Sequence, residues 1–269
     1  MKTLYVSDLD GTLLRSDERT SDYTNDVINS LVKKGMLFSY ATARSYNTAR
    51  KVTAGIKAEI PLIVYNGTMV IDNVTGEELI TNFFDGSVCE VLEELFASGV
   101  YPIVYAMIDD VEKFSFVPKL CSRGMKTFLS TREGDIRTNI VNSTEELKNG
   151  EIFYITCIDE PEKLKHLYEK YRDTYHCVYQ KDTYSDEQWF EIMPKNASKS
   201  NAVTQLKKLL GAEKLVAFGD GVNDIDMFEL ADECYAVANA DPGLKETATG
   251  VIDSNNDDGV AKWLSSNFE

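Results

Sequence analysis

The first 82 residues alternate between two hydrophobic patterns. Short apolar runs, typical of buried strands, end abruptly at polar residues, and longer stretches place apolar residues at helical spacing. Serines precede the helical stretches and Gly35 follows the first of them, as expected for residues that begin and end helices. The predicted strands are residues 4–7, 36–40 and 62–65, and the predicted helices follow Ser21 and Ser45. This alternation predicts a parallel sheet with helices on both faces, followed by a hairpin that begins at Asn66–Gly67.

The pattern changes near residue 83. An amphipathic helix at residues 88–96 is followed by two strands with no helix between them, and further strands and one helix continue this mixture. From Ser198 the alternation of helix and strand resumes. We therefore predict an α/β protein with a Rossmann-like parallel-sheet core at residues 1–82 and 188–269. Residues 83–187 are predicted to form an inserted α+β domain.

Composition and charge narrow the class of protein. The chain has 28 Lys and Arg against 44 Asp and Glu, and its net charge of −16 repels nucleic acid and anionic membranes. No apolar run is long enough to span a bilayer. The apolar run near the N-terminus ends at Asp8, which makes it too short for a secretion signal, so we expect a cytoplasmic protein. The five cysteines lack metal-binding spacing and are expected to be buried, reduced thiols. A small phosphorylated ligand is compatible with this charge if a metal ion is bound, and the sequence leaves both a monomer and a homodimer open.

Polar residues gather directly after three of the predicted strands. These residues are Asp8, Asp10 and Thr12 after the first strand, Thr42 and Arg44 after the second, and Asp220, Asn223 and Asp224 after residues 215–218. Because ligands of open α/β sheets bind outside the carboxyl ends of the strands, these groups are expected to converge although they come from opposite ends of the chain. Four carboxylates in one pocket require a bound cation or raised pKa values. Oxygen ligands without histidine favour Mg²⁺, which indicates phosphoryl chemistry.

Four motifs, in this order, carry a resemblance to a known family. Asp8-Leu9-Asp10-Gly11-Thr12, Thr42, Lys199 and Gly219-Asp220-Gly221-Val222-Asn223-Asp224 resemble the motifs of the haloacid dehalogenase (HAD) superfamily. The segment Glu191-Ile192-Met193-Pro194 leading to Lys199 is similar to the Cof-type phosphatases with a type IIB cap. The resemblance covers the whole chain, because residues 83–187 have the position and size of that cap. It implies Mg²⁺ as the cofactor.

The resemblance also implies a role for each motif residue. Asp8 is expected to attack phosphorus and form an aspartyl-phosphate, with Asp10 as the general acid/base. Thr42 is expected to hydrogen-bond a phosphoryl oxygen, and Lys199 to neutralise charge on the transferring group. The implied Mg²⁺ ligands are Asp8, the backbone carbonyl of Asp10 and Asp220, with Asp224 and Asn223 as further ligand or support.

Several residues beside the motifs have two interpretations. Arg44 contacts the phosphate or the cap, or is an exposed salt-bridged arginine, and Asn66–Gly67 lines the substrate pocket or forms an ordinary turn. Ala43 stands where the family commonly has glycine, as Asn196 and Ser200 do around the third motif, which leaves the orientation of the substrate open. The candidate contacts with phosphate or substrate are Thr12, Thr42, Ala43, Arg44, Asn66, Gly67, Lys199 and Asn223.

Together these features predict a Mg²⁺-dependent phosphomonoester hydrolase for small soluble phosphates. Sugar phosphates are the preferred class, and the cap at residues 83–187 is expected to select among them. Two alternatives use the same residues: a sugar phosphomutase or other phosphotransferase that passes the phosphoryl group to a second hydroxyl, and a non-catalytic sensor of phosphorylated ligands. The expected partner is a small phosphorylated metabolite, and neither nucleic acid nor a membrane is expected.

Overall fold

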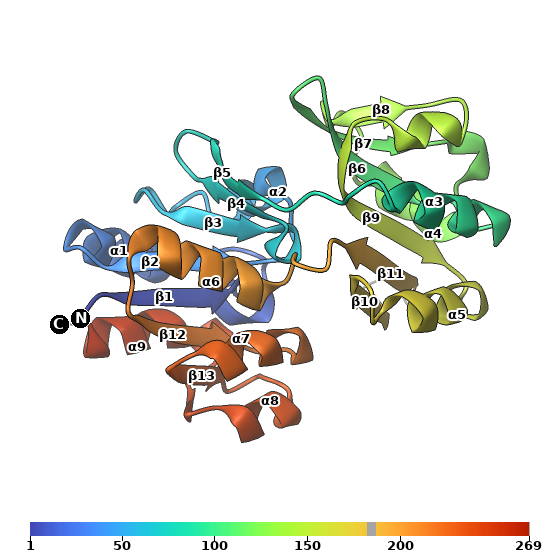
Figure 1. The fold of residues 1–269 in the computed structure, drawn as a ribbon. Coiled ribbons are helices and arrows are strands. Elements are labelled where there is room, and N and C mark those ends of the chain that lie inside the picture. The colour runs from blue at the N-terminus through green and yellow to red at the C-terminus, as the bar shows by residue number, and fades with distance from the viewer. Residues whose placement is uncertain (182–186, 269) are drawn as a thin grey trace. The chain divides into compact units, whose positions relative to one another are not determined.

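The computed structural model describes residues 1–181 and 187–268. The chain divides into two compact units, one formed by Met1–Thr81 with Ala197–Glu269 and the other by Asn82–Asn196. Figure 1 shows the chain leaving the first unit for the second and then returning to it. The predicted α/β class, a parallel-sheet core interrupted by an α+β insertion, is confirmed.

An eight-stranded sheet forms the frame of the first unit, in the order β14-β13-β12-β1-β2-β3-β4-β5. The adjacent strands β14, β13, β12, β1, β2 and β3 run parallel to one another. Strand β4 is antiparallel to β3, and β5 is antiparallel to β4. The reversal lies at Asn66–Gly67, as the hairpin signal predicts. The strands are β1 (Thr3–Asp8), β2 (Leu37–Ala41), β3 (Pro61–Val64), β4 (Met69–Asp72), β5 (Glu78–Thr81), β12 (Lys214–Gly219), β13 (Glu233–Val237) and β14 (Gly250–Ile252).

Helices pack on this sheet in two groups, α6 with α7 and α8, and α1 with α9. Figure 1 shows α6 crossing the near face of the sheet. Ser21, Ser45 and Ser198 cap α1, α2 and α6, because each side chain accepts the backbone N–H three residues further on. The helices are α1 (Asp22–Lys33), α2 (Tyr46–Val52), α6 (Lys199–Leu210), α7 (Ile225–Leu230), α8 (Pro242–Thr247) and α9 (Gly259–Asn267), with single turns η1 (Leu9–Leu13), η2 (Tyr65–Gly67), η5 (Val222–Asp224) and η6 (Asn255–Asp257).

The second unit has a six-stranded sheet of its own, in the order β10-β11-β9-β6-β7-β8. All neighbours are antiparallel except β7 and β8. Apolar side chains of α3 and α5 pack on one face of this sheet in a core that includes Leu95, Leu164 and Phe190. The elements are β6 (Ile103–Ile108), β7 (Val111–Phe116), β8 (Thr138–Ile140), β9 (Glu151–Asp159), β10 (His176–Lys181), β11 (Gln188–Met193), α3 (Val88–Ala97), α4 (Arg123–Ser130), α5 (Pro161–Tyr171), η3 (Pro118–Leu120) and η4 (Glu145–Lys148).

The far boundary of the insertion lies beyond the predicted residue 187. Strand β11 pairs with β10 and β9, with Phe190 opposite both Tyr179 and Cys157, so it belongs to the second sheet. The second unit therefore extends to Asn196. The preceding boundary, at residue 82, differs from the predicted one by a single residue.

A carboxyl group is buried within β11 of the second unit. Glu191 is only 7% exposed. Burial raises its pKa to about 7, and a hydrogen bond with Tyr154 opposes that shift. The folded second unit thus favours a protonated Glu191 at mildly acidic pH.

Two expectations from the sequence, on membrane-spanning segments and on the cysteines, can be compared with the structure. Within residues 1–181 and 187–268, no helix is long and apolar enough to cross a membrane. All five cysteines are free, but only Cys121, Cys157 and Cys234 are buried. Cys89 is exposed and Cys177 is half-buried, so the expectation of five buried thiols is wrong for these two.

Candidate active site

Three neighbouring strands deliver polar side chains to one edge of the first sheet. Strand β1 is buried from Leu4 to its last residue, Asp8, and it lies between β2 and β12. Thr42 follows directly after β2, and Asp220 follows directly after β12. Because the three strands are parallel, their carboxyl ends meet at the same edge.

A cluster of three carboxylates forms there. Asp8, Asp220 and Asp224 each place a carboxylate oxygen within 4.8 Å of the others. Lys199, the first residue of α6, is 3% exposed and donates hydrogen bonds to Asp8 Oδ1 and, at 2.8 Å, to Asp224 Oδ1. The other oxygen of Asp224 accepts the backbone N–H groups of Asp220 at 3.1 Å and Gly221 at 3.2 Å. Both oxygens of Asp224 are therefore engaged by the protein.

The electrostatics of this cluster call for additional positive charge. Burial raises the pKa of Asp8 well above its usual range, and the charges of Asp224 and Asp220 add to that rise, while Lys199 opposes it. Burial and the charge of Asp224 raise the pKa of Asp220 to about 6, against a hydrogen bond from Thr12. Burial opposes a charged Lys199, but the carboxylates of Asp224 and Asp8 outweigh burial and raise its pKa. One ammonium among three carboxylates leaves two negative charges to balance, which fits a divalent cation with oxygen ligands.

Asp10 does not join this cluster. Its side chain is 48% exposed and is held by Arg44, whose Nη2 donates to Oδ1 at 2.6 Å and whose Nε donates to Oδ2 at 2.9 Å. Glu18 binds the same guanidinium at 2.9 Å. These hydrogen bonds, with Asp10 as the largest cause, raise the pKa of Arg44 although burial opposes the charge. The structure shows Arg44 as a salt-bridged arginine that is 22% exposed and whose partner is the expected acid/base residue, and contact of Arg44 with phosphate stays a prediction.

Two glycines permit close approaches that build the site. Gly11 has a φ of +79°, and a Cβ at this position would lie 2.3 Å from Asp220 Oδ2. Gly67 has a φ of +94°, and a Cβ there would lie 2.1 Å from the backbone oxygen of Ser198. The turn at Gly67 therefore packs against the start of α6, where Lys199 begins the helix.

The remaining predicted residues fall into two groups. Thr12, Thr42 and Asn66 are buried: Thr12 donates to Asp220 Oδ1 at 3.0 Å, and Thr42 receives the N–H of Arg44 at its hydroxyl and that of Asn66 at its carbonyl. Ala43 and Asn223 are exposed. Thr12 therefore contacts a carboxylate of the cluster. Asn66 lies in a buried turn that hydrogen-bonds to Thr42, the residue after β2.

Sequence reasoning missed two supporting residues. Glu18 binds Arg44 from a turn in which it adopts a φ of +56°, and an isolated glutamate in a charged segment carries no signal of that role. Asn239 donates to the backbone oxygen of Gly11 at 2.8 Å and accepts the N–H of Asn255 at 3.0 Å. It fixes the turn after Asp10 from a loop 228 residues away. The only available signal is that this loop follows β13, whose carboxyl end lies at the same edge of the sheet.

Comparison with known proteins places this site in a family. A profile described as haloacid dehalogenase-like hydrolase matches residues 5–264. A protein of Streptococcus pyogenes serotype M6 with a provisional phosphatase name is 29% identical over 281 residues, which cover 97% of this chain and 98% of that protein. The 5-amino-6-(5-phospho-D-ribitylamino)uracil phosphatase of Bacillus subtilis is 28% identical over 287 residues, covering 98% of this chain and 97% of its own. A crystal structure from Thermotoga maritima has a TM-score of 0.79 at 27% identity, covering 100% of this chain and 98% of that one.

A parallel sheet that gathers three carboxylates and a buried lysine at its carboxyl edge has a ligand-binding and catalytic site at the place where open α/β sheets carry one. The chain belongs to the haloacid dehalogenase-like hydrolase family. The prediction of an enzyme of this type, a phosphatase, is confirmed at that level.

Proposed function

We propose that this protein is a Mg²⁺-dependent phosphomonoester hydrolase that works through an aspartyl-phosphate on Asp8. The observation that carries the proposal is the buried Asp8 carboxylate, bound by Lys199 and set beside Asp220 and Asp224. A carboxylate in this setting is oriented and partly neutralised, which suits a nucleophile that must approach a phosphate dianion.

The donor set fits Mg²⁺. Asp8, Asp220 and the backbone carbonyl of Asp10 would hold the ion, and Asp224, already bound to Lys199 and two backbone N–H groups, would support it. When bound, the ion supplies positive charge that offsets the carboxylates and the phosphate of the substrate.

In the first half-reaction, an Asp8 oxygen bonds to phosphorus as the bond from phosphorus to the ester oxygen breaks. Asp10 donates its proton to that leaving oxygen. Thr42 and Lys199 bind the phosphoryl oxygens as their charge redistributes. In the second half-reaction, Asp10 takes a proton from water, the water oxygen bonds to phosphorus, and the bond to Asp8 breaks to release inorganic phosphate.

Arg44 has a positioning task in this scheme. Its three hydrogen bonds to Asp10 hold a side chain that is about half exposed to solvent, and Glu18 holds the guanidinium in turn. Because Arg44 donates to both carboxylate oxygens, one of these hydrogen bonds must break when Asp10 carries the proton that it gives to the leaving oxygen, and the other keeps the side chain in place. We propose that Arg44 provides that constraint.

The proposed substrates are small soluble phosphates, with sugar phosphates as the preferred class and the inserted unit as the part that selects among them. The name of the Bacillus subtilis relative supports this class, since that protein acts on a phosphorylated ribityl compound. We also propose a cytoplasmic enzyme, monomeric or homodimeric, whose partners are metabolites. The net charge of −16 and the five free cysteines support this.

The test is release of inorganic phosphate from sugar phosphates, nucleotides and an aryl phosphate, with Mg²⁺ and with EDTA. Asp8→Asn keeps the size of the side chain and is expected to abolish release, whereas Asp26→Asn, an exposed aspartate on α1, is expected to leave it unchanged. Release that persists in Asp8→Asn contradicts the mechanism. An isomerised sugar phosphate in place of free phosphate identifies the phosphotransferase alternative.

A further inference from the structure

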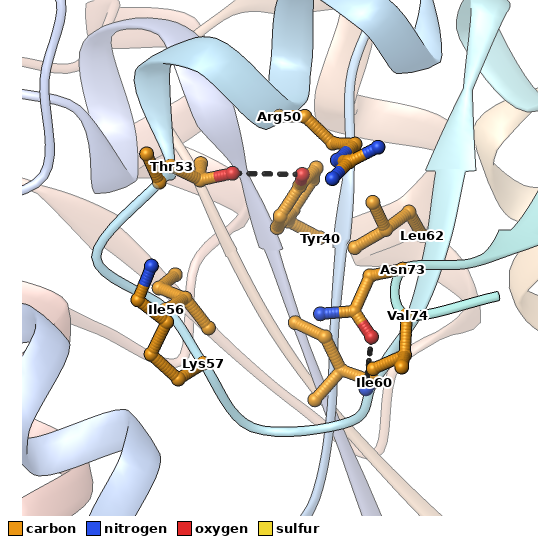
Figure 2. A pocket seen from close by; sticks show the side chains of 10 residues that line it. Tyr40, Arg50, Thr53, Ile56, Lys57, Ile60, Leu62, Asn73 and Val74 are labelled. Atoms are coloured by element: carbon orange, nitrogen blue, oxygen red, sulfur yellow. Dashed lines mark hydrogen bonds between the residues drawn. The ribbon is translucent and has the colours of Figure 1, made fainter. Parts of the chain in front are cut away.

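A cavity of about 330 Å³ lies in the first unit and shares no lining residue with the carboxylate cluster. It is bounded by β2, β3, the end of α2 and the loop that follows α2 (Figure 2). Its volume is at the lower end of the range for small-molecule sites in proteins. A compact organic molecule therefore fits the space.

The lining of this cavity combines aliphatic side chains with polar groups, and the hydroxyls of Tyr40 and Thr53 are hydrogen-bonded. Ile56, Ile60 and Leu62 contribute aliphatic wall. The Tyr40 hydroxyl lies 3.1 Å from Thr53 Oγ1, and because that Thr53 hydroxyl donates to a backbone oxygen of its own helix, Tyr40 is the donor to Thr53. The walls thus favour the apolar body of a ligand and present no buried charge.

The mouth carries two cations. Figure 2 shows Arg50 and Lys57 on different sides of the space. Both residues are exposed, and neither forms an ion pair with any residue in the described part of the chain. No acidic side chain from that part lines the cavity. The two charged side chains that line the cavity are thus both cations, which favours an anionic group on a ligand.

We propose that this cavity binds a small organic anion, with its apolar body between Ile56, Ile60 and Leu62 and its anionic group between Arg50 and Lys57. Charge and apolar surface are both required. Lys57 alone is an ordinary solvated side chain, Arg50 alone is a surface cation over the ring of Tyr46, and the aliphatic wall alone is an ordinary gap in packing. The site is independent of the proposed phosphatase activity, because it uses none of the residues around Asp8.

Calorimetric titration of the full-length protein with 3-phenylpropionate tests the proposal. We expect one binding site, with binding at least tenfold weaker for the neutral 3-phenylpropionamide and for acetate, which lacks the apolar body. Arg50→Gln and Lys57→Gln are each expected to weaken binding several-fold. Lys51→Gln, which removes an exposed cation next to Arg50 in sequence but outside the cavity lining, is expected to change nothing.

Ala54→Phe fills the cavity mouth from α2's C-terminal side and is expected to abolish binding while leaving phosphate release intact. Equal affinity for the acid and the amide would overturn the proposal, since the cations would then contribute nothing. Binding that survives in both Arg50→Gln and Lys57→Gln would place the ligand elsewhere. The absence of heat at about 10 mM probe, above the roughly millimolar affinity of a weak specific site, would also overturn it. Circular dichroism of each variant shows that these results come from folded protein.

Discussion

Replacing Gly67 by alanine tests whether the turn η2 positions Lys199 through the start of α6. Alanine at a φ of +94° costs about 1–2 kcal/mol of unfolding free energy, whatever surrounds it. At Gly67 the new Cβ would also lie 2.1 Å from the backbone oxygen of Ser198 and 2.9 Å from the backbone nitrogen of Lys199. Backbone must therefore move by roughly 1 Å to reach ordinary contact, which costs about 1–3 kcal/mol more.

Gly35→Ala is the matched control, because Gly35 has a φ of +100° in the same unit but nothing within 4 Å of the added Cβ. Urea unfolding is expected to show a loss of about 1–2 kcal/mol for Gly35→Ala and about 2–5 kcal/mol for Gly67→Ala. Turnover is expected to stay normal in the control and to fall by about 10- to 100-fold in Gly67→Ala, since a shift near 1 Å misplaces the lysine. Equal stability and equal turnover of the two variants would refute the reasoning.

Three further outcomes follow from the charges. Lys199→Met leaves Asp8 and Asp224 buried without their cation. Turnover is expected to fall at least 100-fold, and the free energy of unfolding in Mg²⁺-free buffer by about 3–5 kcal/mol. An unchanged midpoint of urea unfolding would contradict this. Because the pKa of Asp220 is about 6 and that of Asp8 is also raised without metal, Mg²⁺ must displace protons at low pH, and the Kd from calorimetry is expected to rise at least tenfold per pH unit below 6. The raised pKa of Glu191, about 7, means that the folded state holds this proton more tightly than the unfolded state, so stability is expected to fall by about 3 kcal/mol as pH rises from about 4.5 to 7. Glu191→Gln is expected to remove that slope from urea unfolding measured across this range, and an identical slope in the variant would exclude Glu191 as its origin.

Short sequence patterns predicted the helices and strands that depend mainly on residues close together in the sequence. The serines before α1, α2 and α6 accept the expected backbone hydrogen bonds, and the strands of the parallel core end where their apolar runs end. Elements held mainly by neighbours distant in sequence were missed. Helix α7 (Ile225–Leu230) has only six residues, and the three-residue strand β8 (Thr138–Ile140) exists because it pairs with β7.

The site shows the same division. The topology of parallel strands was enough to predict that Asp8, Thr42 and Asp220 meet at one edge. The topology could not predict the direction of side chains. It therefore did not predict that the Asp10 side chain is exposed and forms a salt bridge with Arg44. The boundary at residue 187 was wrong for a similar reason, since only strand pairing shows which sheet β11 joins.

The discontinuous first unit has a consequence for the chain during synthesis. Strand β1 is the centre of its sheet, yet its neighbour β12 begins at Lys214, which pairs with Thr3. At about 5–20 residues per second, one edge of β1 waits roughly 10–40 s for its partner after it has been made. The inserted unit is continuous in sequence and can fold within that interval.

An unpaired edge of a buried apolar strand is a template for pairing with other chains. Premature termination between Asn196 and Lys214 would therefore release a product with a completed insertion and an open, aggregation-prone core edge. Asp8 is among the first residues translated, and it gains the lysine and carboxylates around it only when α6, β12 and the following residues up to Asp224 have been made.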